Sequence, residues 1–234
     1  MTQKKSNSWA FHEKKITECK DCPRLRNHCL AIAKLKRRSY LTDTYWGRPI
    51  VGFGDHRARL LVIGLAPAAH GANRTGRVFT GDRSGDWLYR ALHKAGFANQ
   101  PVSLNIHDGL KLKDVFVTAT VKCAPPDNKP TPPEIRRCLR FLEWELDKLA
   151  NTRVYLALGK IGFDQTWNIL KNRKEASGSR PAFGHGVSIK LDSGRWLLAS
   201  YHPSQQNTFT GKLTEPMFDG IFTTAKAIII RSLP

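Results

Sequence analysis

Four short apolar runs alternate along this chain with segments of helical pattern. Each run has the length and β-branched content of a buried strand. The runs cover residues 60–63, 115–121, 154–158 and 196–200. Because strands that alternate with helices form parallel sheets covered on both faces, the chain is predicted to adopt an α/β fold. We expect three layers, αβα, around a central, mainly parallel sheet of four strands.

The helical segments show recognisable ends. Residues 87–95 stop before Gly96, a residue typical of the position after a helix. Residues 131–149 begin with a capping box of Thr131 and Glu134. Further helices are expected from about residue 160 and over about 215–231, and residues 30–38 read as a basic helix. The chain is predicted to be a single domain, 1–234, with a basic, cysteine-containing segment over about 1–45.

The loop after the first apolar run is the leading candidate for a ligand site. Residues 64–82 connect a strand to a helix, and this span is too long for a simple connector. In open α/β sheets, ligands bind beyond the carboxyl ends of strands, where this loop lies. Its glycines and alanines allow a flat ligand to approach the backbone, and Phe79 offers a stacking face. Its polar side chains include His70, Asn73, Arg77 and Asp82.

Two further strands end in polar loops that contain prolines. The second apolar run leads into residues 122–130, which include Cys123 and Asn128. The fourth run leads into residues 201–208, which include His202. Since the carboxyl ends of parallel strands share one edge of a sheet, these loops are expected to converge with residues 64–82 and form a site.

The charge of the chain indicates a polyanionic partner. There are 38 lysines and arginines against 19 aspartates and glutamates, a formal net charge of +19. Residues 1–40 alone carry 11 basic and 3 acidic side chains. A generally charged surface is the alternative, but it would intersperse the two signs. Nucleic acid is therefore the first candidate partner.

Localisation and redox state follow from what the sequence contains. The polar start of the chain predicts no signal peptide, and no apolar run approaches the roughly 20 residues of a membrane span. We expect a cytoplasmic, nucleoid-associated monomer with no membrane contact. In a reducing compartment, five cysteines favour metal binding or burial over disulfides.

Four of the cysteines form a second constellation. Cys19 and Cys22 make a C-x₂-C pair, and Cys123 and Cys138 stand 15 positions apart. Four thiolates can hold zinc or an iron–sulphur cluster. Structural zinc more often uses two short knuckles, so the spread of the second pair favours the bulkier cluster. Alternatively, Cys123 and Cys138 are reduced core residues. Cys29 is interpreted as a bystander, although it could substitute as a ligand.

These motifs together resemble one enzyme family. Residues 64–82, 122–130 and 202–208, with the four cysteines in matching order, are similar to a family 5 uracil-DNA glycosylase of the UDGb type. The similarity runs from about Cys19 to the C-terminal helix. The related family 4 carries Glu where this chain has Leu65, and the lack of a polar residue at Leu65 and Ala68 favours family 5. The resemblance implies a 4Fe–4S cluster held by Cys19, Cys22, Cys123 and Cys138.

The resemblance also implies an activity. A deaminated base (uracil, and hypoxanthine as a second substrate) is flipped out of DNA, and its glycosidic bond is hydrolysed to leave an abasic site. Asp82 can supply an anion beside the sugar and position the water, and His202 can donate to the departing base. Asn128 can read the base edge and Phe79 can stack on it. The resemblance also implies that His70, Asn73 and Ala68 line the same pocket.

Each assignment has a simpler alternative. Asp82 could cap the helix that follows it. His202 and Asn128 could be ordinary loop residues, and Phe79 could belong to the core. At the level of function, the chain could be a non-catalytic iron–sulphur or zinc module that binds nucleic acid. A metal-dependent nuclease is less favoured, because no paired carboxylates follow the strands.

Overall fold

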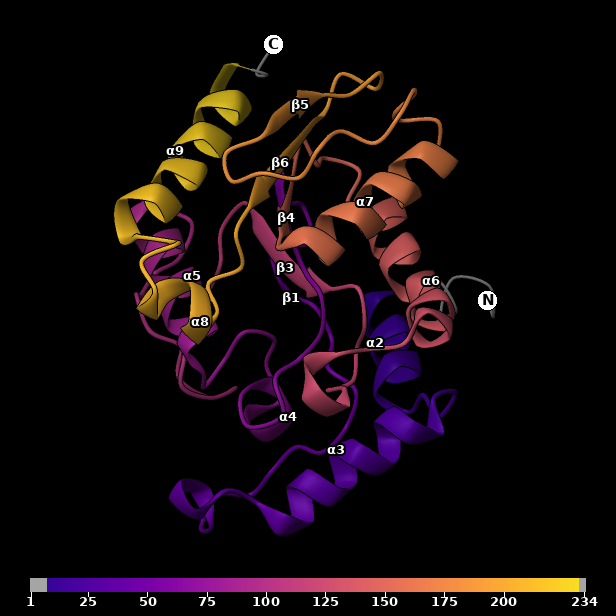
Figure 1. Ribbon diagram of the computed structural model, residues 1–234, viewed down its shortest axis with the longest axis vertical. Helices are drawn as coiled ribbons and strands as arrows, with labels where there is room; N and C mark the ends of the chain where they lie inside the picture. Colours follow the sequence, from indigo (N-terminus) through magenta and orange to yellow (C-terminus); the bar gives the residue numbers. More distant parts are fainter. Residues whose placement is uncertain (1–7, 232–234) are drawn as a thin grey trace.

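A computed structural model describes residues 8–231 and places a six-stranded sheet at the centre of the molecule (Figure 1). The strand order is β1-β3-β2-β4-β6-β5. The four inner strands are mutually parallel: β2 (Leu60–Gly64), β3 (Val115–Ala119), β4 (Val154–Leu158) and β6 (Trp196–Ser200). The predicted α/β class and mainly parallel sheet are therefore confirmed.

The predicted number of strands was wrong by two. β1 (Phe53–Gly54) and β5 (Ser188–Lys190) add antiparallel edges to the sheet. Strands of two and three residues are too short to show any hydrophobic period, so the sequence did not reveal them. β3 also ends at Ala119 rather than at residue 121. Beyond it, the Thr120 and Val121 amides still donate to the carbonyls of Gly64 and Leu65, so backbone pairing continues without strand geometry.

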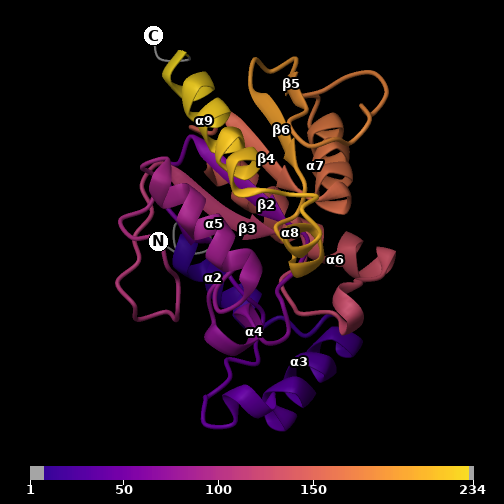
Figure 2. The same ribbon diagram turned by 60° about the vertical axis from the view of Figure 1, so that its left-hand side comes forward.

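Helices cover both faces of the sheet, as expected for three layers (Figures 1 and 2). α5 (Arg83–Lys94) and α9 (Glu215–Arg231) pack on the face that receives alternate strand residues such as Val62 and Leu156. α6 (Pro132–Lys148) and α7 (Lys160–Asn172) pack on the opposite face, around Ile63 and Tyr155. Burial on both faces explains why these strands read as continuous apolar runs.

Helix ends follow their local sequence. Gly96 follows α5 with φ of +80°, and the capping box of Thr131 and Glu134 is present at the start of α6. The helix predicted at residues 30–38 was misplaced. It is α3 (Pro23–Leu35), which begins after Cys22 with a proline in its first turn and is followed by Lys36, whose φ is +54°.

The N-terminal segment packs against the helical layer. α2 (Trp9–Thr17) contacts α6 through His12, which stacks on Trp144 with ring centroids 3.9 Å apart. Beneath this contact the Lys122 ammonium lies 2.8 Å from the Glu145 carboxylate, and both side chains are buried. The remaining short elements are η1 (Arg38–Tyr40), α4 (Ala72–Thr75), η2 (Pro126–Asn128) and α8 (Gln205–Phe209). Over residues 8–231 we find no helix with the length and apolarity that a membrane span requires.

Candidate active site

The carboxyl ends of the parallel strands meet at one edge of the sheet. The register pairs Gly64 with Ala119 and Leu158 with Ser200, so the loops that follow these strands begin side by side. In Figures 1 and 2, α4 and α8, which belong to two of these loops, lie beyond this edge. The sequence-based expectation that the loops converge is confirmed.

Phe79 and His202 come together at this edge from two different loops. Their ring centroids are 5.9 Å apart and the ring planes differ by 29°. Phe79 is 9% exposed and has φ of +52°, a left-handed backbone that is uncommon for an aromatic residue. Gly64 makes room for it, because a Cβ there would lie 2.6 Å from the Phe79 ring. The loop thus directs Phe79 toward the end of β2.

His202 is held between β6 and α8. The Asn207 side-chain amide donates to the His202 carbonyl at 2.8 Å, which ties the residue to the first turn of α8. Ser204 caps the same helix by accepting from the Asn207 backbone N–H. Burial lowers the pKa of His202 to about 4, against an ordinary value of 6.5. The imidazole is therefore neutral at neutral pH and can offer one N–H donor.

Asp82 both caps a helix and presents a carboxylate oxygen to the loop. Its Oδ1 accepts from the Gly85 backbone N–H at 3.0 Å, so the capping alternative is confirmed. Its Oδ2 lies against Gly71, where a Cβ would come within 2.0 Å of that oxygen. Burial raises the pKa of Asp82, and the nearby Asp86 raises it further. The cap uses only one oxygen, so the other remains for chemistry.

Asn128 lies in the turn η2 and is exposed. It and Asp127 have φ of +56° and +53°, a backbone region that asparagine and aspartate tolerate better than most residues. No hydrogen bond within residues 8–231 engages the Asn128 side-chain amide. The geometry therefore leaves both its donor and its acceptor available, and its contact with a base stays a prediction.

His70 has a partner that the sequence did not indicate. Its Nδ1 hydrogen-bonds to the Tyr45 hydroxyl at 3.0 Å, and the same hydroxyl accepts from the Arg37 backbone N–H at 3.4 Å. Burial lowers the pKa of His70, and Arg37 lowers it further. Tyr45 lies in a segment that reads as irregular, and no motif distinguishes it from a core tyrosine.

The loop residues Asn73 and Arg77 are both buried. The Asn73 side-chain amide donates to the Cys29 carbonyl at 3.2 Å, whereas its Oδ1 has no hydrogen-bond partner within residues 8–231, so its contact with a base stays a prediction. Its backbone N–H donates to the carbonyl of Ala68. Arg77 is also turned inward, where it forms a buried ion pair with Asp108 at 2.8 Å. Arg77 was predicted from its polarity, and Asn73 from its polarity and from the family resemblance, and neither signal tells which way a side chain points.

The four cysteines of the second constellation line one cavity. Cys19 and Cys22 lie between α2 and α3, Cys123 follows β3, and Cys138 lies in α6. Burial raises the pKa of Cys138 to about 11. Within residues 8–231, no group of three or more histidine, cysteine, aspartate or glutamate side chains could hold a single metal ion. Cys29 is fully buried, and its thiol lies 3.6 Å from the Ala124 carbonyl oxygen.

Hydrogen-bond donors point at two of these sulfurs. The Lys122 backbone N–H donates to Cys138 Sγ at 3.3 Å, and the Arg140 guanidinium donates to Cys19 Sγ at 3.7 Å. Such donors are typical partners of metal-bound thiolates, whose negative charge they stabilise. The donor set therefore suits a group with four thiolate ligands.

Comparison with known proteins agrees with this geometry. A family model described as "Uracil DNA glycosylase superfamily" matches residues 51–226. The Type-5 uracil-DNA glycosylase of Mycobacterium tuberculosis is 52% identical over 216 residues, 91% of this chain and 79% of the relative. That of Thermus thermophilus is 48% identical over 213 residues, 91% of this chain and 94% of the relative.

A relative from another uracil-DNA glycosylase type is less similar to this chain. The Type-4 uracil-DNA glycosylase of Pyrobaculum aerophilum is 30% identical over 164 residues, 68% of this chain and 74% of the relative. The identity with the type-5 relatives is higher and extends over more of the chain. This chain belongs to the uracil-DNA glycosylase superfamily and, within it, to the type-5 family.

Proposed function

We propose that this protein is a DNA-repair glycosylase that hydrolyses the bond between uracil and deoxyribose and leaves an abasic site. One observation carries the proposal: the loops of a type-5 family member bring Asp82, Phe79 and His202 to the same edge of the sheet. A buried base must first be flipped out of the duplex, at a cost of a few kcal/mol. Phe79 offers a face for the flipped ring, and Asn128 reads its edge.

The hydrolysis needs three contributions from the protein. The anionic Asp82 carboxylate stabilises positive charge that develops on the sugar, and its Oδ2 accepts a proton from the attacking water. The water oxygen bonds to the anomeric carbon as the bond to the base nitrogen breaks, and the base leaves with the electron pair. The neutral His202 donates a hydrogen bond to the base oxygen on which negative charge grows.

The activity is tested on labelled duplexes that contain one uracil, one hypoxanthine or one xanthine. We expect base release in the presence of EDTA, detected as strand breakage only after alkali. Cleavage without alkali that EDTA abolishes would indicate a nuclease. Binding with no base release would indicate a non-catalytic module. We propose that hypoxanthine is accepted too, because the small Ala68 leaves room in the pocket.

We further propose that a 4Fe–4S cluster occupies the cavity lined by Cys19, Cys22, Cys123 and Cys138. When bound, the cluster would supply a cross-link between the N-terminal segment, the loop after β3, and α6. The proposal is supported by four thiols around one cavity and by the donors that point at Cys19 and Cys138. A single zinc ion would need its four sulfurs at about 2.3 Å from one point.

Anaerobically purified protein is therefore expected to be brown, with a broad visible absorbance band and about four irons per chain. Cys138→Ser should lose the iron and lower the thermal unfolding midpoint, because the cross-link is lost. Cys29→Ser serves as the matched control, since it also removes a buried thiol but should keep the iron. Stoichiometric zinc with negligible iron would contradict the assignment.

We propose that the protein is a nucleoid-associated monomer. A basic surface near the pocket loop is expected to bind DNA. Lys36, Arg37 and Arg38 follow the end of α3, and the Arg37 backbone N–H is linked to His70 through the Tyr45 hydroxyl. Replacing all three by alanine is expected to flatten the log–log salt dependence of duplex binding by up to about 3 units, if each touches a phosphate. The slope is measured by titration at several salt concentrations. An unchanged slope would place the DNA elsewhere.

A further inference from the structure

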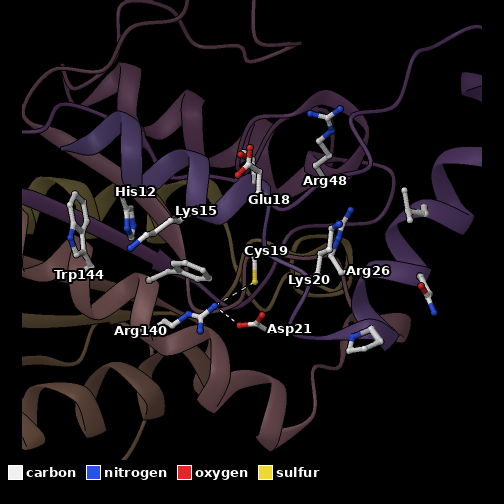
Figure 3. A pocket seen from close by; sticks show the side chains of 15 residues that line it. His12, Lys15, Glu18, Cys19, Lys20, Asp21, Arg26, Arg48, Arg140 and Trp144 are labelled. Carbon is white, nitrogen blue, oxygen red and sulfur yellow. Dashed lines mark hydrogen bonds and ion pairs between the residues drawn. The ribbon is translucent and has the colours of Figure 1, made fainter. Parts of the chain in front are cut away.

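A groove with a volume of about 1280 Å³ runs between α2, α3 and α6, outside the predicted base pocket (Figure 3). Its basic lining residues come from separate parts of the chain. They are His12, Lys15, Lys20, Arg26, Arg48 and Arg140. Leu30, Phe141 and Trp144 add an apolar wall. Figure 3 shows Lys20, Arg26 and Arg48 on the same side of the groove.

The positive charge of the groove is largely uncompensated. Of the two acidic lining residues, Asp21 pairs with Arg140. Glu18 lies 3.9 Å from Lys14, which is outside the groove lining. Over residues 8–231, no carboxylate forms an ion pair with Lys15, Lys20, Arg26 or Arg48. Lys15, Lys20 and Arg48 are also exposed, so their charges face solvent.

Hydrogen bonds connect one end of the groove to the pocket loop. The Arg26 guanidinium donates to the Gly47 carbonyl at 3.0 Å. The Gly47 backbone N–H in turn donates to the Asn73 carbonyl at 3.0 Å. Asn73 lies in α4, within the loop that carries His70 and Phe79. These bonds join the segment that carries Arg48, the residue after Gly47, to the backbone of the pocket loop.

We propose that this groove binds the phosphate backbone of the DNA that flanks the flipped uracil. The inference rests on the proposed function, because it takes DNA as the substrate. A groove lined by cations that have no ion-pair partner within the described residues suits a polyanion, and the bonds from Arg26 through Gly47 attach one end of the groove to the pocket loop. Lys15, Lys20 and Arg48 are the residues expected to neutralise phosphates.

The test compares two triple variants that remove the same charge. Lys15→Ala/Lys20→Ala/Arg48→Ala removes three groove cations. Lys111→Ala/Lys113→Ala/Lys190→Ala removes three exposed lysines near the amino ends of the strands. Binding to a duplex with an abasic site is measured between about 50 and 200 mM salt. The groove variant should flatten the log–log slope by up to about 2.7 units, at about 0.9 per phosphate contact, and the control should change it little.

A single substitution guards against a folding defect in the triple variant. Lys20 is exposed in the turn before α3, so Lys20→Glu should fold normally and weaken binding more than Lys20→Ala. Equal slopes for the groove variant and its control would overturn the proposal. Uracil release from the saturated complex at low salt is measured in parallel for the unaltered protein and the control variant, and we expect the control to keep the rate of the unaltered protein. If the unaltered protein released no uracil, the proposed function would be overturned. The salt dependence of binding would still show whether the groove contacts the DNA backbone.

Discussion

Replacing His202 by alanine is expected to slow uracil release by about 100- to 1,000-fold, measured under single-turnover conditions. The size follows from the loss of one donor to a developing negative charge, which costs about 2.7–4 kcal/mol of barrier. The donor is a neutral imidazole, because burial lowers the pKa of His202 to about 4. It therefore acts by a hydrogen bond that strengthens in the transition state, without full protonation of the base.

The leaving group distinguishes catalysis from positioning. Release of 5-fluorouracil should depend less on His202, because that base leaves more easily and needs less stabilisation. Affinity for a duplex with an abasic site should be nearly unchanged, since the base is absent there. Equal losses with both bases would reassign His202 to DNA positioning. His107→Ala is the matched control. It removes an exposed histidine that lies outside the three loops of the candidate site, so it should keep the full rate.

A weaker variant tests how His202 is held. Asn207 donates to the His202 carbonyl, so Asn207→Ala should slow release less than His202→Ala does. Loss of that hydrogen bond loosens the backbone of His202, but the His202 imidazole is still present. The two substitutions together should cost little more than His202→Ala alone, because both act through the same side chain.

The architecture was predictable because burial leaves a direct trace in sequence. Strands buried on both faces become continuous apolar runs, and the parallel topology then places their polar loops at one edge. The edge strands β1 and β5 leave no such trace. The sequence also did not show that the side chains of Asn73 and Arg77 point inward. Their partners, Cys29 and Asp108, lie 44 and 31 positions away in the sequence.

The glycines of the pocket loop make room for other groups than the sequence suggested. Their presence predicted that a ligand approaches the backbone closely. In the structure, Gly64 accommodates the ring of Phe79 and Gly71 accommodates the carboxylate of Asp82. The small residues are thus required by the functional side chains themselves. Sequence reveals that space is needed, but the fold determines which group fills it.

Asp82→Asn is expected to lower the rate of uracil release at least about tenfold, equivalent to about 1.4 kcal/mol of barrier. The substitution removes the negative charge but keeps a side-chain oxygen for the Gly85 N–H. Asparagine caps helices about as well as aspartate does, so α5 should remain stable. Thermal unfolding and binding to an abasic duplex are the checks, and both should match the unaltered protein.

The pH dependence of the rate separates the charge of Asp82 from its capping role. Because burial raises the pKa of Asp82, the acid limb of the rate profile should lie above the ordinary aspartate value of 3.8. Activity requires the carboxylate, so the rate should fall as pH drops through that raised pKa. Asp86→Asn is the matched control on the same helix. It removes a neighbouring negative charge, so it should move the limb to lower pH and leave the rate at neutral pH unchanged. An acid limb that Asp86→Asn does not shift, or a full rate in Asp82→Asn, would assign the role to another group.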